Sequence, residues 1–77
     1  MYSIAKMTEA DVRELLATKS EVETPEDLDF LYKDIVRAVT RSARGEAQGT
    51  RDSLAEYYDV PMELIVGLER LLGVHLD

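Results

Sequence analysis

The chain has 77 residues, of which 16 are acidic and 9 basic, so its formal net charge is −7. It has no cysteine and one histidine, which excludes disulfide scaffolds, cysteine zinc sites, thiol nucleophiles and histidine metal clusters. The acidic balance disfavours binding to DNA or to anionic lipid, because contacts to phosphates need clustered lysine and arginine. It favours a basic protein as the partner.

The length and the apolar content indicate one small folded domain over residues 1–77. Apolar residues make up 45% of the chain, which is typical of globular proteins and too high for a disordered acidic tail. The longest apolar run is far shorter than the roughly 20 residues that span a membrane, and the first residues lack the pattern of a secretory signal. We therefore expect a cytoplasmic protein that makes no membrane contact and is a monomer when free.

The spacing of apolar residues and the positions of helix-capping residues predict four helices and no strand. The first helix begins at Thr8, where Asp11 three residues later completes a capping box, and it fades around Lys19. Thr24 is a good N-cap for the second helix, which runs to the residue before Gly45. The apolar stripe of this second helix consists of Leu28, Leu31, Ile35 and Val39.

The second half of the chain predicts two shorter helices. Thr50 caps a third helix that runs through Tyr58. A fourth helix is capped by Asp59, has Pro61 in its first turn and is closed by Gly73. Its buried stripe consists of Leu64, Ile65, Leu68, Leu71 and Leu72. Short connections favour antiparallel neighbours, so we expect an all-α fold, a compact antiparallel four-helix domain.

The charge is unevenly distributed along the chain. Residues 21–34 hold six acidic residues against Lys33, a local charge of −5, and residues 52–77 hold six against Arg70, again −5. Between them, residues 35–51 hold four arginines against one glutamate, a charge of +3. The simpler explanation is a solvated surface with arginines at the negative end of a helix. The alternative is an acidic surface on the start of the second helix and on the third helix that steers a cationic partner.

One aromatic residue does not fit the simpler explanation. At 100° per residue, Phe30 lies on the opposite side of the second helix from the apolar stripe, with Glu26, Lys33 and Arg37 as its neighbours. An exposed aromatic side chain surrounded by charges is typical of an interface hot spot. The competing possibility is that Phe30 packs against the first helix or its loop and is buried.

Tyr57 and Tyr58 raise the same question, because two adjacent tyrosines do not both face inward from one helix. We expect one of them in the core and the other as a large exposed surface that carries a hydroxyl group.

No residue pattern indicates an enzyme. Nothing sets a carboxylate in an apolar pocket, Gly45 and Gly49 lack the Lys-Ser/Thr of a phosphate-binding loop, and the acidic spacing matches no calcium loop. We expect no catalytic residue, no cofactor and no metal.

Residues 51–71 have the apolar spacing of a helix-turn-helix motif with a tight turn at Asp59. Its second helix offers no Arg, Lys, Asn or Gln near its start to pair with base edges, and its acidic side chains repel phosphate. The exposed residues expected there are Pro61, Met62, Glu63, Val66 and Gly67. A helix-turn-helix transcriptional regulator is therefore an alternative, and direct nucleic-acid binding is not our main expectation.

Several short segments of the chain carry a family resemblance. They are Ser3-Ile4, Thr8-Glu9-Ala10-Asp11-Val12, Leu15-Leu16, Leu28 to Val36, the pair Tyr57-Tyr58, and Pro61 to Leu72. This combination resembles the immunity proteins of nuclease colicins and pyocins, best over residues 3–45. The chain departs from that family where Asp59 replaces the proline after the tyrosines, where the next connection is shorter, and in lacking the C-terminal Trp-Arg-Ala-Ala-Asn-Gly.

The resemblance implies a bacterial inhibitor that binds the basic nuclease domain of a toxin beside its active site and so excludes nucleic acid. On the matching positions, it implies a specificity-setting face made by Glu26, Asp29, Phe30 and Lys33. It implies a shared anchor at Tyr57 and Tyr58, which Glu56 directly precedes. A phage-type acidic inhibitor of a host nucleic-acid-binding complex would rest on the same physics and stays open.

Overall fold

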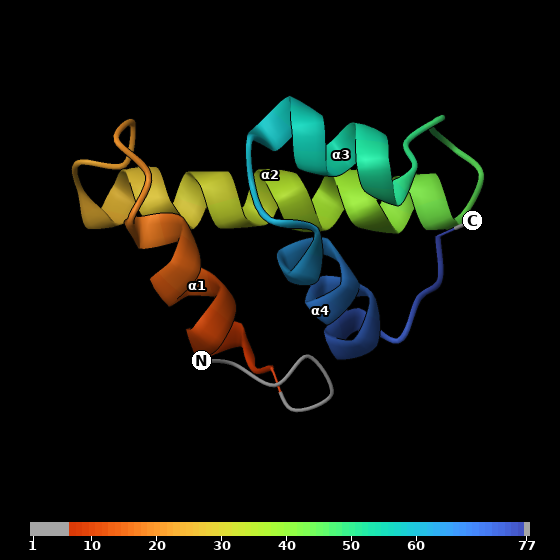
Figure 1. Cartoon of the computed structure of the whole chain (residues 1–77), viewed down its shortest axis with the longest axis horizontal. Helices are drawn as coiled ribbons and strands as arrows, with labels where there is room; N and C mark the ends of the chain where they lie inside the picture. The colour runs from red at the N-terminus through yellow and green to blue at the C-terminus, as the bar shows by residue number, and fades with distance from the viewer. Residues whose placement is uncertain (1–6, 77) are drawn as a thin grey trace.

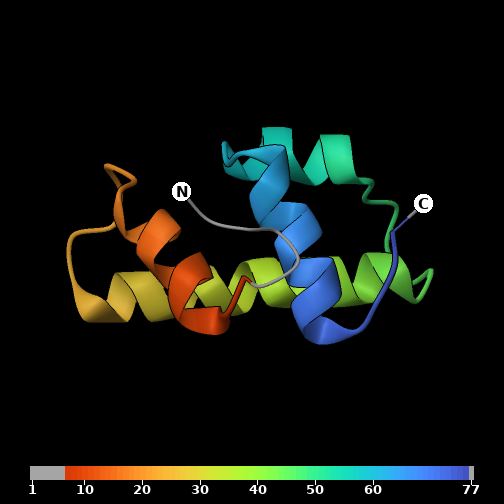
Figure 2. The same cartoon turned by 60° about the horizontal axis from the view of Figure 1, so that its bottom comes forward.

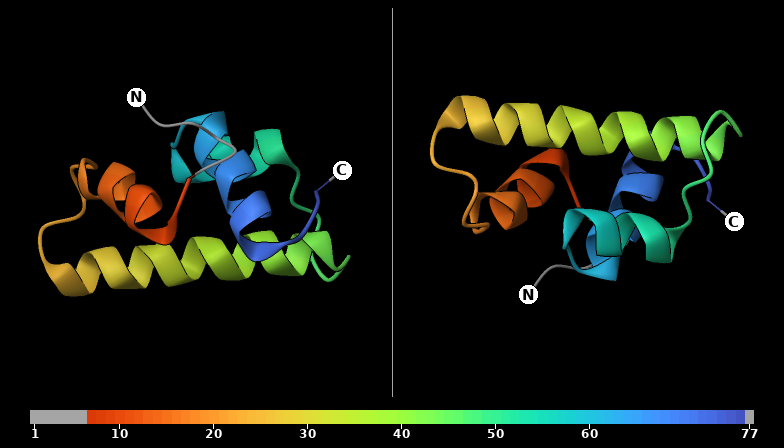
Figure 3. Two further views of the ribbon diagram at one scale, coloured as in Figure 1. Left: turned by 90° about the horizontal axis from the view of Figure 1, so that it is seen from below. Right: turned by 90° about the horizontal axis from the view of Figure 1, so that it is seen from above.

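Helix α2 (Pro25–Ala43) is the longest element of the computed structural model (Figure 1), and the other three helices lie on one side of it (Figure 3). They are α1 (Glu9–Ala17), α3 (Arg51–Tyr58) and α4 (Met62–Leu72). The structure describes residues 7–76, so Ser3, Ile4 and Asp77 lie outside the described residues. Within residues 7–76 the fold is all-α with four helices, which confirms the predicted fold class.

Three of the four helices begin with a threonine capping box, at the positions that the sequence predicts. The hydroxyl groups of Thr8, Thr24 and Thr50 accept hydrogen bonds from the backbone N–H three residues later, at 3.1–3.2 Å. The side chain at that later position accepts in return from the threonine N–H. Each box satisfies two backbone donors that the helix itself leaves unpaired, so the starts of α1, α2 and α3 are determined locally.

The fourth helix begins later than predicted. Asp59 does not cap α4; it ends α3 with a left-handed backbone conformation (φ 54°), and Pro61 is the residue that precedes α4. The N–H of Val60 donates to the carbonyl oxygen of Ala55 at 3.0 Å, which closes α3 through this turn. Aspartate is favoured both at helix starts and in left-handed turns, and the local sequence does not distinguish the two uses.

The core forms where α4 meets the other helices. α3 runs back along the C-terminal half of α2, whereas α1 and α4 are inclined to α2, and α4 contacts all three other helices (Figure 2). The radius of gyration of 11.6 Å agrees with the value of about 11.5 Å expected for a globular chain of this length. The fully buried side chains are Val12, Leu16, Ile35, Val39, Leu64, Ile65, Leu68 and Leu76.

Polar contacts fix how α1 sits against the rest. The guanidinium group of Arg13 lies 4.3 Å from the centre of the Tyr32 ring on α2, a cation–π contact, and it also pairs with Asp29 at 3.2 Å. At the other end of α1, the Lys19 ammonium group donates to the carbonyl oxygen of Asp59 at 2.8 Å. These contacts join α1 both to the start of α2 and to the turn between α3 and α4.

One buried hydroxyl group lacks a partner within residues 7–76. The Ser42 oxygen near the end of α2 is buried and makes no hydrogen bond there. It lies under Gly49, where a side chain would collide with it and would crowd Leu54, so glycine permits this close approach. Leaving a buried hydroxyl unpaired costs free energy, so Ser42→Ala should leave the stability unchanged or raise it by up to about 1 kcal/mol.

Urea denaturation of the natural chain and of Ser42→Ala measures the difference in the free energy of unfolding, and Ser53→Ala is the matched control. The Ser53 hydroxyl oxygen accepts from the Thr50 N–H at 2.8 Å in the capping box of α3. Its loss should lower the free energy of unfolding by about 1 kcal/mol. If Ser42→Ala were as destabilising as Ser53→Ala, the Ser42 hydroxyl would have a partner that contributes to stability.

Candidate functional site

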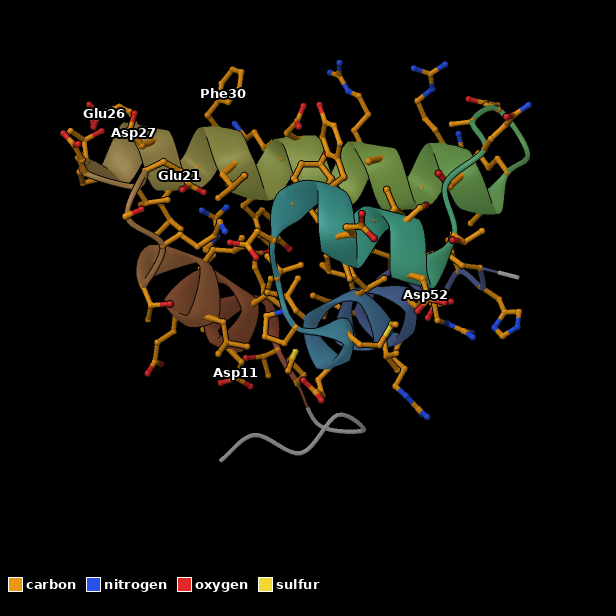
Figure 4. The ribbon with its side chains drawn as sticks, turned by 45° about the horizontal axis from the view of Figure 1, so that its top comes forward. Asp11, Glu21, Glu26, Asp27, Phe30 and Asp52 are labelled. Carbon is orange, nitrogen blue, oxygen red and sulfur yellow. The ribbon has the colours of Figure 1, made fainter. Side chains whose placement is uncertain are left out.

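Phe30 is the most prominent feature of the outer side of α2. Phe30 is 76% exposed, although its side chain is large and apolar. The helix turns its apolar stripe toward α1 and α4, so a residue on the opposite side has no helix to pack against. In Figure 4, Phe30 points away from the ribbons of the other helices. Of the two possibilities that the sequence left open, the structure places Phe30 in solvent.

The charged neighbours of Phe30 include a paired set and a free acid. Asp29 pairs with Lys33 at 2.9 Å and with Arg13 at 3.2 Å. The hydrogen bond from Lys33 and then that from Arg13 lower the pKa of Asp29 below its usual value. Asp29 and Lys33 therefore largely neutralise each other, whereas Glu26, in the first turn, is exposed. Pro25, Glu26, Asp29, Phe30, Lys33, Asp34 and Arg37 together line a surface hollow.

A second hollow lies on the other side of Phe30. It combines apolar side chains with three carboxylates, and its lining consists of Glu21, Val22, Asp27, Phe30, Leu31 and Asp34. The labelled Glu21, Asp27 and Phe30 lie toward the same end of the molecule in Figure 4. The sequence places Glu21, Asp27 and Asp34 in the predicted acidic surface but not among the predicted contact residues, and Glu21 approaches α2 only through the fold of the loop 18–24. We call the two hollows, divided by Phe30, the Phe30 face.

The tyrosine pair divides as expected between the core and the surface. Tyr58 is half-buried against the core, and its hydroxyl group donates to the Asp34 carboxylate at 2.8 Å. Burial and then this hydrogen bond raise the pKa of Tyr58. Tyr57 is 79% exposed, with its ring edge-on to Tyr58 at 4.9 Å between centroids. Glu56, which precedes them, is exposed on α3.

Asp34 joins the two predicted groups of site residues. It lines both hollows of the Phe30 face and accepts the hydrogen bond from Tyr58, so α3 is held beside the middle of α2. Glu26, Asp29, Phe30 and Lys33 line a hollow with Asp34, whereas Tyr57 and Tyr58 line a separate groove that Asp34 also borders. The residue that connects them was not among the predicted site residues, because the connection depends on the packing of α2 against α3.

The acidic residues of the segment 52–77 do not form one surface with those of the segment 21–34. Asp52 lies at the start of α3, toward the opposite end of the molecule from Glu26 and Asp27 (Figure 4). Glu69 is 4% exposed and forms an ion pair with Arg51 at 2.6 Å. The predicted acidic surface is therefore concentrated at the start of α2 and in the loop before it.

The helix-turn-helix spacing corresponds to a real pair of helices, α3 and α4, joined through residues 59–61. Leu54, Ile65 and Leu68 are buried, as the motif requires. The prediction that Gly67 is exposed was wrong: it is buried, and a side chain there would collide with Met7. Among the described residues of α4, Arg70 is the one basic side chain, and it lies in the last turn.

Among residues 7–76, no group of three histidine, cysteine or acidic residues is placed to hold a metal ion. No helix in the described part of the chain is long and apolar enough to cross a membrane. The chain matches no protein-family profile, no curated protein and no solved structure.

Proposed function

We propose that this chain is an inhibitor that binds a basic protein through the Phe30 face, in the manner of a bacteriocin immunity protein. The observation that carries the proposal is Phe30 itself, a 76% exposed aromatic residue between two hollows with acidic rims. A large apolar side chain in solvent gains free energy when a partner covers it, and aromatic residues at the centre of an interface dominate its affinity.

The charges around Phe30 support a basic protein as the partner. Glu26 and Asp27 carry negative charge at the start of α2, and Glu21 adds a carboxylate that pairs with Lys19 at 3.3 Å. The apolar walls of the second hollow suit the stem of a lysine or arginine side chain. A nucleic-acid-cleaving domain is basic because it binds phosphates. The proposal therefore takes a nuclease toxin domain as the partner, and the inhibitor as a bacterial cytoplasmic protein that is a monomer when free.

Inhibition in this proposal needs no catalytic group, cofactor or metal on the chain. A bound acidic domain of 77 residues beside a nuclease active site blocks nucleic acid by its bulk and by repelling phosphate, because the net charge of the chain is −7. Because the Phe30 face binds beside the active site, the residues that set its specificity do not have to imitate the substrate.

The direct test mixes the purified chain with colicin- and pyocin-type nuclease domains, both deoxyribonucleases and ribonucleases. We expect a 1:1 complex by calorimetry with at least one of them, and loss of its nucleic-acid cleavage at stoichiometric inhibitor. A chain that binds none of these domains but binds one DNA sequence in a gel-shift assay would be a helix-turn-helix regulator instead. The paired helices α3 and α4 are the observation that keeps this second candidate.

The association rate should depend strongly on salt. Because unscreened charge accelerates the encounter, the association rate constant should fall about tenfold between roughly 0.01 and 0.15 M ionic strength. The dissociation rate constant should change much less, since the apolar contact at Phe30 is insensitive to screening. Stopped-flow mixing measures both rate constants. Glu26→Gln should lower the association rate constant, and Glu63→Gln, which removes an exposed acid on α4, is its charge-matched control. An association rate that does not respond to salt would contradict steering by the acidic end of α2.

A further inference from the structure

Arg37 and Arg41, in the C-terminal half of α2, border a groove beside the Phe30 face, and Asp34 and Arg37 line both. The groove lies between the C-terminal half of α2 and α3, and has a volume of about 300 Å³. Ala38, Leu54 and Tyr58 contribute apolar surface to it beside the buried Ser42 hydroxyl group, and the exposed Arg37, Arg41 and Tyr57 also line it. This volume is at the lower end of the range for binding sites, and suits one or two side chains of a partner.

The helix dipole does not explain Arg37. Cations gain from the negative end of a helix only within its last turn, and α2 ends at Ala43, so Arg41 lies in that turn and Arg37 precedes it. Within residues 7–76, no ion pair or side-chain hydrogen bond neutralises Arg37. It is exposed beside Tyr57 in a chain whose net charge is −7. Arg37 is therefore a solvated cation beside the groove, available to an anionic group of a partner.

The ion pair that Arg41 makes is weak. Its one ion pair among the described residues is with Glu46 at 3.7 Å, and both side chains are more than half exposed. Exposed pairs of this kind contribute little free energy, so a competing carboxylate displaces Glu46 at small cost. Arg37 and Arg41 are four residues apart on one helix, so their Cβ atoms lie about 6 Å apart on the same side and both guanidinium groups reach one anion.

We infer that this groove docks an acidic segment of a protein partner, with a carboxylate between Arg37 and Arg41 and an adjacent apolar side chain against the apolar surface of Ala38 and Leu54. Tyr57 covers the apolar side chain with its exposed ring. Asp34, at the end of the groove, is held by the Tyr58 hydroxyl group and disfavours a longer run of negative charge, so the segment carries one carboxylate rather than several. A nucleic-acid strand, with a charge on every phosphate, suits the groove less well.

A carboxylate bound in the groove would add to the contacts that the proposed partner makes at the Phe30 face. Binding of an acidic segment there does not require that the partner is a nuclease. A partner that covers both α2 and α3 would present cations over Glu26 and Asp27 and a carboxylate over Arg37. The groove is testable alone with a short peptide, so its failure is distinguishable from a failure to bind nuclease domains.

The probe is acetyl-Leu-Asp-Leu amide, with acetyl-Leu-Asn-Leu amide as its uncharged match, titrated into the whole ¹⁵N-labelled chain. We expect saturable shifts of the Arg37, Arg41 and Tyr57 signals, and binding of the Asn peptide weaker by about three- to fivefold. Arg37→Gln should weaken the binding of the Asp peptide by a similar factor of about three to five. Arg44→Gln should leave it unchanged, because Arg44 is exposed on the same helix end but does not line the groove.

Three outcomes would overturn the inference. Equal effects of Arg37→Gln and Arg44→Gln would reduce it to unspecific attraction by the basic helix end. Equal affinity for the Asp and Asn peptides would remove the role of the carboxylate. Tighter, saturable binding of a single-stranded oligonucleotide at the same signals would assign the groove to nucleic acid. Circular dichroism of both variants verifies that they remain folded, as expected for exposed side chains.

Discussion

Glu69→Gln should lower the free energy of unfolding by about 2–3 kcal/mol, the largest loss we expect from one polar substitution. One carboxylate oxygen of Glu69 accepts from the Arg51 side chain at 2.6 Å, and the other accepts from the Leu76 backbone N–H at 2.6 Å. The side chain is 5% exposed, so water does not replace these bonds. An amide has one acceptor oxygen for these two donors and leaves one of them facing its own N–H₂ group.

The loss is large because of what Glu69 joins. It ties the first turn of α3 to the segment after α4, whose Leu76 is 1% exposed in the core. A domain of this size has a total stability of only about 4–12 kcal/mol, so the variant removes a substantial part of it. Urea denaturation at pH 7 measures the loss, and Glu63→Gln, an exposed acid on the same helix, should change stability by less than about 0.5 kcal/mol. A Glu69→Gln protein as stable as Glu63→Gln would contradict the role of this contact.

The same contact predicts how stability depends on pH. Burial raises the pKa of Glu69, but the hydrogen bonds from Arg51 and Leu76 and the nearby positive charges outweigh it, so the pKa in the folded chain is below its ordinary value of 4.5. A lowered folded pKa means that the contribution is complete above about pH 4.5 and is lost as pH falls through the folded pKa. The difference in unfolding free energy between the natural chain and Glu69→Gln should therefore shrink as pH is lowered from 7 to 3.

Phe30→Ala should weaken binding of the proposed nuclease partner by more than about 1 kcal/mol while leaving the fold intact. The side chain is 76% exposed, so its removal opens no cavity and should change unfolding free energy by less than about 0.5 kcal/mol. In the complex, however, a partner that covers Phe30 loses the apolar contact at the centre of the interface. Calorimetric titration of the natural chain and the variant with the same nuclease domain gives the difference directly.

Met62→Ala is the matched control for Phe30→Ala. Met62 is also an exposed apolar side chain, 37% exposed, but it lies at the start of α4 and away from α2. Its removal should not change the affinity for the partner. Equal losses from the two variants would point to a general effect of surface hydrophobicity, and an unfolded Phe30→Ala protein would mean that Phe30 belongs to the core.

The local signals in the sequence were sufficient to predict most of the secondary structure. The capping boxes of Thr8, Thr24 and Thr50 involve residues three apart, so the residues that form them are visible as a short motif. The same holds for Gly45 and Gly73, whose positive φ angles end α2 and α4. The error at Asp59 arose because one residue type serves two local roles, and the choice between them depends on where Pro61 and α4 pack.

The candidate site was predictable only in part. The exposure of Phe30 follows from its angle to the apolar stripe, provided that no other element covers the outer side of α2, and the sequence does not contain that condition. Asp34 was missed because its significance lies in its contact with Tyr58, 24 residues later. Glu69 was counted as surface charge because an acidic residue is usually exposed, and the contact with Arg51 that permits its burial spans 18 residues.

The number and class of the helices, most of their ends, the acidic balance and the side of α2 that carries Phe30 follow from the amino-acid sequence. Each of these depends on composition or on residues within one helical turn of each other. Four further features follow only from the packing of the helices: Phe30 is exposed, Tyr58 rather than Tyr57 faces inward, Glu69 is neutralised in the interior, and Arg37 borders a groove. These depend on which helix faces meet, and helix packing is set by contacts between residues that are far apart in the chain.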